Sequence, residues 1–533
     1  MPNWRGLVIH RWGLSMSNEM ARNAGTHRLC FLVFLASPFV GWLATAQKMH
    51  YARETKPKVK GFIELFPHTM DYPLLITIPI IAMVVAILFW IIAIKLNKSE
   101  FRGYKYKYRL RGSELVSASA LNNKTTERKK QQVTLATIKM PTSLENLQTL
   151  IVGAIGSAKT VTLSYAIYTI MMRGDRQIIV DPDGTFASMF YKSGDVILNA
   201  YDARSPGWTI FNEMRRDYDF DTYAYSLVPL GKSSTEEEWN AYGRLLVSEV
   251  ARKLHEEGEP HFDKLFYWCC AAEEEALEEY CRGTLAEALF IGTDRTIGSA
   301  RFVLSNKLSA HMKMPAGDFS IRDWLNDESK GNIFITWKED QIAVMAPLIS
   351  SFVDVICNVI LSLPEDETRK VWLLTDELAS LEKLKGLMPV LTKGRKKGVR
   401  VISCLQTISQ LNAIWGKEDA DTLRGSYRNL VVLGSARADE HTAETLSKSL
   451  GDIEVVRDGR SKTSADKGSS ETNQERGEKD RLVTAAEISN LGDREGYVAF
   501  TRGYPVAKVL IPITDFKMRT EPFVERRALG GNP

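Results

Sequence analysis

The sequence predicts an α/β protein that carries a helical insertion and two N-terminal membrane helices. Short apolar, β-rich segments alternate with helical stretches over the larger, C-terminal part of the chain, which is typical of a mostly parallel sheet covered on both faces. One long helical stretch, 205–315, interrupts this alternation. Two runs with almost no charge, 29–46 and 72–95, lie near the N-terminus.

Composition limits the size and chemistry of the protein without indicating a partner. The 533 residues have room for about three domains. The 69 basic and 65 acidic side chains leave a net charge of +4, which is too small to argue for nucleic acid. The six cysteines show no metal-binding spacing, so we expect them to be reduced and structural.

The two apolar runs are best explained as membrane helices. The run 29–46 is just long enough to span hydrocarbon, and 72–95 is a better span. A signal peptide is the alternative for the first, but it would lie unusually late in the chain and lacks a persuasive cleavage site. A buried core helix is the alternative for the second. We expect 1–111 to form a membrane anchor.

Basic residues beside the two runs predict the orientation. Two spans put both outer flanks on one side, and these flanks hold eleven basic residues against five in the loop between the spans. The positive-inside rule therefore places the N-terminus and the large C-terminal part in the cytosol. The outer residues are Arg5, Arg11, Arg22, Arg28, Lys95, Lys98, Arg102, Lys105, Lys107, Arg109 and Arg111, and the loop residues are Lys48, Arg53, Lys56, Lys58 and Lys60.

A strand, a loop of small residues and a helix follow one another at 149–165, T-L-I-V-G-A-I-G-S-A-K-T-V-T-L-S-Y. A P-loop needs this context, because its backbone N–H groups and helix N-terminus surround phosphates while Lys reaches the β/γ oxygens. The pattern G-x-x-x-x-G-K-[ST] is met except at its second Gly. An ordinary strand–turn–helix is the alternative. The candidate phosphate-binding residues are Gly153, Ala154, Ile155, Gly156, Ser157, Ala158, Lys159 and Thr160.

A second apolar strand, 371–375, ends in Asp376 and Glu377. P-loop ATPases hold Mg²⁺ and polarise water with carboxylates in this position. Asp376 and Thr160 are therefore the candidate metal ligands, and Glu377 is the candidate catalytic carboxylate. The two patterns together predict a site for ATP and Mg²⁺.

The remaining segments complete a four-part layout. The run 342–363 looks like a third span, but it contains Asp354 and Asn358 and lies between two strands, so we expect a buried helix on the sheet. The parts are 1–111, the anchor; 112–204, a connector and the first part of a nucleotide-binding domain; 205–315, an all-α insertion; and 316–533, the second part. Strands are expected at 150–152, 177–180, 196–198, 333–337, 371–375, 399–404, 430–434 and 496–501.

Charge distinguishes two further segments. The insertion carries clustered acids that would repel a phosphate backbone, so it suits protein contacts or is simply a solvated helical surface. The stretch 458–481 is rich in Ser, Lys, Asp, Glu and Gly without an apolar face, so we expect a mobile loop. The last twenty residues are expected to form a tail along the sheet domain.

With these features the chain resembles the coupling proteins of bacterial conjugation and type IV secretion, of the TrwB/TraD type. The resemblance runs over nearly the whole chain from the first membrane span. Matching segments are Arg173-Gly174-Asp175-Arg176, Ile179-Val180-Asp181-Pro182, Phe211-Asn212-Glu213, Tyr242-Gly243-Arg244-Leu245-Leu246, Ser299-Ala300-Arg301-Phe302-Val303-Leu304-Ser305 and Leu391-Thr392-Lys393-Gly394-Arg395.

The resemblance implies an ATPase of the bacterial inner membrane, multi-pass, with a RecA-like motor fold and an all-α domain in the cytosol. In the family a ring, expected to be a hexamer, receives the relaxase-bound single strand and passes it to the secretion channel. The implied partners are single-stranded DNA, duplex DNA without sequence preference, relaxosome proteins, an inner-membrane channel protein and further copies of the chain.

The family pattern also implies two catalytic roles. Arg395 matches the candidate arginine finger, which reaches the nucleotide of a neighbouring subunit. It lies in the basic run 393–397, and the alternative is that this run binds DNA phosphates. Gln406 follows the strand 399–404, in the position of a γ-phosphate sensor.

Ala158 departs from the pattern, because it stands where the P-loop has its second Gly. A Cβ in the left-handed region costs roughly 1–2 kcal/mol. The leading hypothesis is a DNA-stimulated ATPase. The alternative is a nucleotide-binding assembly platform that links relaxosome to channel with little or no hydrolysis. A chromosome-segregation DNA translocase would be expected to carry more spans and a C-terminal DNA-reading domain.

Overall fold

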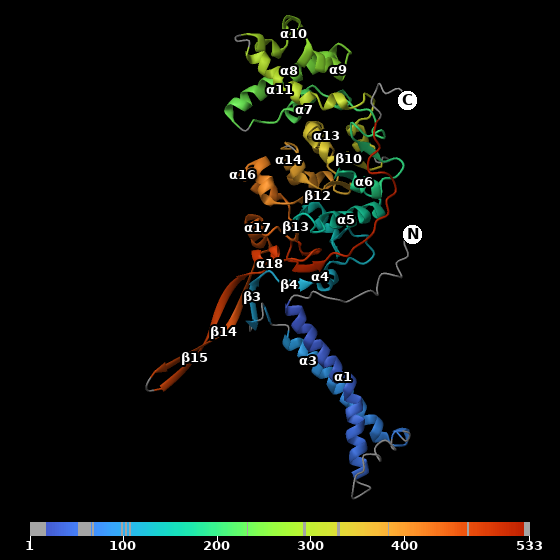
Figure 1. The fold of residues 1–533 in the computed structure, drawn as a ribbon, viewed down its shortest axis with the longest axis vertical. Coiled ribbons are helices and arrows are strands. Elements are labelled where there is room, and N and C mark those ends of the chain that lie inside the picture. Colours follow the sequence, from blue (N-terminus) through green and yellow to red (C-terminus); the bar gives the residue numbers. More distant parts are fainter. Residues whose placement is uncertain are drawn as a thin grey trace. The chain divides into compact units, whose positions relative to one another are not determined.

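The structure is a computed structural model of the 533-residue chain. It describes residues 18–51, 66, 69–97, 100–101, 104–105, 108–231, 233–291, 295–327, 331–381, 383–465 and 468–526. The chain divides into two compact units: Met1–Gly112 with Ile453–Asp480, and Ser113–Asp452 with Arg481–Pro533 (Figure 1). The predicted domain limits stay predictions.

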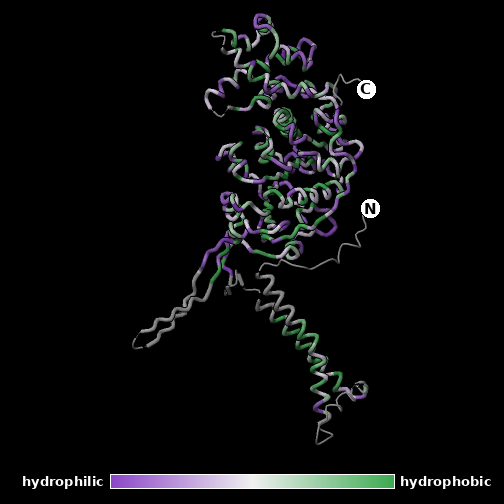
Figure 2. The backbone as a smooth tube through the Cα atoms, viewed as in Figure 1, coloured by the Kyte–Doolittle hydropathy of each residue, from purple (hydrophilic) through white to green (hydrophobic). Residues whose placement is uncertain are grey.

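Two helices of the first unit, α1 (Asn18–Tyr51) and α3 (Pro73–Asn97), pack side by side (Figure 1). A Cβ added to Gly41 would lie 3.3 Å from the Ala82 Cβ, so small residues let the two backbones approach closely. Both helices are hydrophobic over most of their described length (Figure 2) and expose large apolar side chains such as Phe39 and Ile81. By length and composition each is able to cross a membrane, as the sequence predicts.

The structure differs from the prediction of a loop at 458–481. These residues form most of two long strands, β14 (Asp452–Ala465) and β15 (Gly468–Arg481), which continue a sheet begun by β3 (Tyr108–Gly112). β14 pairs antiparallel with β3. A β ladder satisfies backbone N–H and C=O groups whatever the side chains are, so an alternating apolar pattern is not required. A two-stranded sheet, β1 (Glu100–Phe101) with β2 (Tyr104–Lys105), completes the described strands of this unit.

The second unit is built on a ten-stranded sheet of order β4-β17-β16-β13-β7-β12-β11-β8-β10-β9. The strands from β13 to β9 are parallel to one another, whereas β16 runs antiparallel to both β13 and β17. All eight predicted strands are present. The bounds are β4 (Leu115–Ser117), β7 (Thr149–Val152), β8 (Arg176–Pro182), β9 (Val196–Leu198), β10 (Ile333–Trp337), β11 (Val371–Thr375), β12 (Val399–Leu405), β13 (Asn429–Leu433), β16 (Glu495–Ala499) and β17 (Val506–Leu510).

Helices cover the sheet, as the sequence predicts. Side chains of α4 (Ala118–Thr125), α5 (Lys159–Arg173) and α6 (Thr185–Phe190) share one hydrophobic core with residues of β7 to β13, β16 and β17. α13 (Ile342–Ser362) is the predicted third apolar run, and 72% of that stretch is buried, against 11% for each N-terminal run. The interpretation of 342–363 as a buried helix is therefore confirmed. Four more helices are α14 (Leu387–Lys393), α15 (Ile408–Trp415), α16 (Lys417–Ser426) and α17 (Glu440–Leu450).

The chain between β9 and β10 is helical, as expected of the insertion (Figure 1). Its acidic cluster at 273–279 is exposed on and beside α10. At the other end of the chain, the described tail runs along the sheet domain: Phe516 packs against Tyr165 and Phe190, and the Arg519 N–H donates to the Ser188 carbonyl over 2.7 Å. The helices are α7 (Tyr218–Leu227), α8 (Ser234–Glu256), α9 (Phe262–Phe266), α10 (Glu274–Cys281), α11 (Arg295–Leu308) and α12 (Ile321–Asn326).

Candidate nucleotide site

The candidate phosphate loop leaves the middle of the sheet. β7 lies between β12 and β13, and all four of its residues are buried. The loop 153–158 joins its carboxyl end to the first turn of α5. Backbone hydrogen bonds hold the loop, because Gly153 donates to the Leu405 carbonyl over 3.1 Å and Ala154 to the Gly434 carbonyl over 2.7 Å. Parallel sheets bind ligands at this carboxyl edge.

Gly153 is required by close packing. A Cβ there would lie 2.4 Å from the Ser157 Oγ and 2.6 Å from the Leu433 Cβ, distances that real Cβ atoms do not show. Gly156 has a φ of 80°, in the region that favours glycine. Ile155, between them, is exposed. The two glycines therefore allow a tight turn, and the loop between them faces solvent.

Ala158 takes the backbone conformation that the missing glycine would supply. Its φ is 69° and its ψ 30°, in the left-handed region, immediately before the first residue of α5. The residue packs against the core beneath α5. The loop thus keeps the shape of a P-loop with an alanine, and the folded chain bears a strain of about 1 kcal/mol at this position.

Lys159 turns its side chain back over the loop. Its Nζ donates to the carbonyls of Gly153, over 2.6 Å, and Ala154, over 3.1 Å. Burial lowers the pKa of Lys159, while the charges of Glu377 and Asp376 act in the opposite direction. This ammonium group therefore lies between the loop and two carboxylates that come from a distant part of the sequence.

Asp376 is a buried carboxylate with a free oxygen. It follows β11, which is separated from β7 only by β12, and its Oδ1 has no hydrogen-bond partner among the described residues. Burial raises the pKa of Asp376 to about 6, and Lys159 opposes the shift. An unpaired buried carboxylate oxygen destabilises the folded chain, and a bound cation would remove this destabilisation.

The donor set fits Mg²⁺ bound together with phosphate. Asp376 and the hydroxyl of Thr160, in the first turn of α5, offer the oxygen ligands that Mg²⁺ prefers. In the described part of the chain no three His, Cys, Asp or Glu side chains gather as a metal site. The remaining ligands would therefore be water and phosphate oxygens, which is the usual arrangement for Mg²⁺.

Glu377 and Gln406 lie beside the same edge. Glu377 begins a short 3₁₀ turn, and its carboxylate accepts from the Ala379 N–H over 3.3 Å. Burial raises the pKa of Glu377, while the Ala379 N–H, the Gln406 amide and Lys159 lower it. Gln406 directly follows β12, the strand between β7 and β11. The structure thus brings the predicted Lys159, Asp376, Glu377 and Gln406 together.

A further carboxylate, Asp181, was not among the predicted site residues. It lies on β8, beside β11, and is fully buried. It accepts from the backbone N–H groups of Phe186 and Ala187 over 3.0 and 2.7 Å, which fixes the start of α6. Burial raises the pKa of Asp181 to about 8, and the Asp376 charge adds to the shift. The available signal was an apolar strand ending in Asp, the same pattern that identified Asp376.

Arg395 is not at this edge. β11 and β12 are parallel, with Val371 opposite Val399, and Arg395 precedes β12 whereas Asp376 follows β11. At about 3.3 Å a residue, the sheet separates the two side chains by more than the reach of an arginine. The Arg395 side chain is exposed. It can therefore act on a nucleotide only if that nucleotide is bound by another subunit.

Comparison with known proteins identifies the family. The family model for the type IV secretion-system coupling protein DNA-binding domain matches residues 132–512. The coupling protein TraD of Escherichia coli (strain K12) is 29% identical over 397 residues, which is 70% of this chain and 53% of TraD, so the chain spans about half the length of that relative.

Solved structures give the same result. The conjugative coupling protein TrwBdeltaN70 in its unbound monoclinic form has 48% identity and a TM-score of 0.76, with 80% of this chain and 99% of that chain covered. TrwB in complex with ADP and Mg²⁺ matches with 48% identity, a TM-score of 0.75 and coverage of 80% and 100%. The resemblance seen in the sequence is confirmed. This chain belongs to the coupling proteins of type IV secretion and conjugation, of the TrwB/TraD type, and has their RecA-like α/β fold with a mixed sheet.

Proposed function

We propose that this chain is a membrane-anchored, DNA-stimulated ATPase that delivers DNA to a type IV secretion channel. The observation that supports this most strongly is the arrangement of Lys159, Asp376 and Glu377 at the carboxyl edge of one sheet, around a loop with P-loop geometry. ATP with Mg²⁺ is the proposed ligand pair. TrwB, which covers 80% of this chain, has been solved with ADP and Mg²⁺ and with the ATP analogue ADPNP.

Each side chain has a distinct proposed role. Lys159 leaves the Gly153 and Ala154 carbonyls to neutralise β/γ-phosphate charge, and the loop N–H groups bind the phosphates. Thr160 and Asp376 hold Mg²⁺, which supplies positive charge to the phosphate oxygens. Glu377 orients the attacking water, and Gln406 senses the γ-phosphate from the neighbouring strand.

The larger assembly belongs to the proposal as well. Arg395 completes the site of a neighbouring subunit, so hydrolysis requires a ring, for which we propose six copies. The basic run 393–397 and other channel residues bind single-stranded or duplex DNA through its phosphates, without sequence preference. Helices α1 and α3 anchor the ring in the bacterial inner membrane with the sheet domain in the cytosol. There it receives the relaxosome and contacts an inner-membrane channel protein.

A second function depends on the methyl group of Ala158, which stands where the P-loop pattern has glycine. If its methyl keeps phosphate from its productive position, the chain is a nucleotide-binding platform that assembles relaxosome and channel with little hydrolysis. The conformation of Ala158 argues against this, because the loop already has the φ that the glycine would have. We therefore rank the ATPase first.

ATP turnover by the full chain in detergent, with and without single-stranded DNA, tests the proposal. We expect DNA-stimulated turnover that Lys159→Ala abolishes and that Glu377→Gln lowers at least ~100-fold while nucleotide binding is kept. Lys338→Ala, outside the proposed site, is the matched control and should retain turnover. An inactive parent that Ala158→Gly activates would support the platform instead. Turnover unaffected by Lys159→Ala would refute the assigned site.

A further inference from the structure

The segment 383–386 lies between the candidate catalytic carboxylates and the helical insertion. It begins shortly after the 3₁₀ turn that Glu377 caps, and it ends at the start of α14. Leu378, Leu381 and Leu384 are each almost fully buried, so the described residues at both ends of this path are anchored in the core by their side chains.

Gly386 holds the end of the segment tightly against α13. Its N–H donates to the Asp354 Oδ1 over 2.9 Å, and a Cβ at this position would lie only 2.6 Å from the Cys357 Cβ. Asp354 is buried, and burial raises its pKa to about 6 while the Gly386 N–H acts in the opposite direction. One buried carboxylate thus joins the segment to α13.

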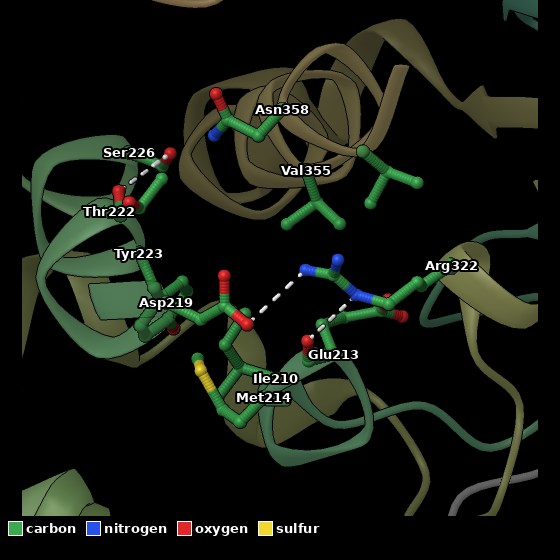
Figure 3. A pocket seen from close by; sticks show the side chains of 11 residues that line it. Ile210, Glu213, Met214, Asp219, Thr222, Tyr223, Ser226, Arg322, Val355 and Asn358 are labelled. Atoms are coloured by element: carbon green, nitrogen blue, oxygen red, sulfur yellow. Dashed lines mark hydrogen bonds and ion pairs between the residues drawn. The ribbon is translucent and has the colours of Figure 1, made fainter. Parts of the chain in front are cut away.

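Helices α7 and α13 meet over a small cavity beside this junction. Figure 3 shows Thr222, Tyr223 and Ser226 of α7 on one side and Val355 and Asn358 of α13 on the other. The cavity measures about 30 Å³, which is room for little more than a water molecule. The two helices therefore lie close together, so a movement of α7 would displace side chains of α13.

Lys385 makes a second contact with the insertion. Its Nζ lies 3.6 Å from the centroid of the Tyr225 ring on α7, and the guanidinium of Arg244 on α8 lies 4.7 Å from the same ring. Arg244 is itself held in place, because it donates to the Val228 and Pro229 carbonyls over 3.1 Å. Tyr225 is thus an acceptor for one cation from the sheet domain and one from the insertion.

We propose that segment 383–386 is a latch that transmits the nucleotide state at Glu377 to the helical insertion, with Lys385 as a positioning residue. The inference rests on the proposed nucleotide site and adds a route from it to α7 and α8. Partners that bind the insertion would change the affinity for nucleotide through the same contacts, because coupling between two binding sites is reciprocal.

Hydrogen–deuterium exchange of the full chain in detergent, with and without ADP and Mg²⁺, tests the latch. In the parent we expect ADP to slow exchange in two places, the first turns of α5 and the helix α7. In Lys385→Met the response of α5 should remain while that of α7 falls about two- to five-fold, the size of one exposed cation–π contact. Lys385→Arg should restore the response of α7, because arginine keeps the cation over the Tyr225 ring.

Lys383→Met is the matched control. It removes a cation from the same exposed segment, but the Lys383 Nζ pairs with Asp419 of α16 over 2.7 Å and not with the insertion, so both responses should persist. Tyr225→Leu should reduce the α7 response at least as much as Lys385→Met, because Arg244 loses the same ring, and the double variant should lose no more than Tyr225→Leu alone. A parent that responds at α5 but not at α7 overturns the latch alone. A parent without any response at α5 overturns the nucleotide site, and the latch with it.

Discussion

At the scale of single residues, Ala158 decides how the P-loop of this chain differs from its pattern. Its φ of 69° means that the alanine is accommodated in the left-handed region and does not force the loop into another shape. The cost of about 1 kcal/mol is small beside the 5–15 kcal/mol of a typical domain. The other loop residues and Lys159 can therefore stay in place around it.

We predict that Ala158→Gly changes nucleotide affinity little. Glycine removes the strain but also loses the methyl that packs on the core and gains entropy in the unfolded chain. Titration with a fluorescent ADP analogue and Mg²⁺ should show tightening of no more than about five-fold, the equivalent of 1 kcal/mol. An increase of a hundred-fold would contradict this prediction and show that the methyl obstructs phosphate.

At the scale of secondary-structure elements, three helices in the described part of the chain have the length and composition of a membrane span, and their surroundings distinguish them. α13 is enclosed between the sheet domain and α7, whereas α1 and α3 leave most of their apolar side chains exposed. A soluble surface rarely exposes so much apolar area, and lipid would cover it. Two of the three therefore suit the bilayer.

We predict that a fragment beginning at residue 97 is soluble without detergent, because the two exposed apolar helices are then absent and α13 stays buried. Expression followed by ultracentrifugation should leave this fragment in the supernatant and the full chain in the membrane pellet. Recovery of a folded fragment only from the membrane pellet would indicate that α13 enters lipid.

At the scale of the whole molecule, the proposed arginine finger lies away from the candidate nucleotide site of its own chain. The proposed lysine, carboxylates and sensor gather at the carboxyl edge of the sheet, while Arg395 is exposed at the opposite edge. Relocating Arg395 within one chain would require unravelling β12. Its catalytic role, if it is a finger, therefore depends on a second copy.

We predict complementation between two inactive variants. Lys159→Ala and Arg395→Ala should each lack turnover alone, whereas an equal mixture that exchanges subunits should restore roughly a quarter of the sites, those that combine an intact lysine with a neighbour's intact arginine. Turnover measured after mixing and DNA addition is the readout. If Arg395 serves only DNA binding, the turnover of the mixture should equal the mean of the turnovers of the two separate variants.

The sequence by itself determined the elements whose signal is local. The sequence predicted the eight apolar strands and the helical insertion, because buried elements show a characteristic period and length of apolar runs. Short motifs predicted the phosphate loop and the family. The sequence also pointed to Asp376 and Lys159 through short motifs with a fixed strand context. The hairpin at 458–481 was missed since a backbone ladder leaves no apolar pattern in such a polar segment.

Only the tertiary structure decided what depends on contacts distant in sequence. Strand order brought Asp181 beside Asp376, with the consequence that the Asp376 charge adds to burial in raising the pKa of Asp181. Strand direction put Arg395 at the edge away from the site. The φ of Ala158 was likewise set by the surrounding packing, because the same residue in isolation would be free to adopt other conformations.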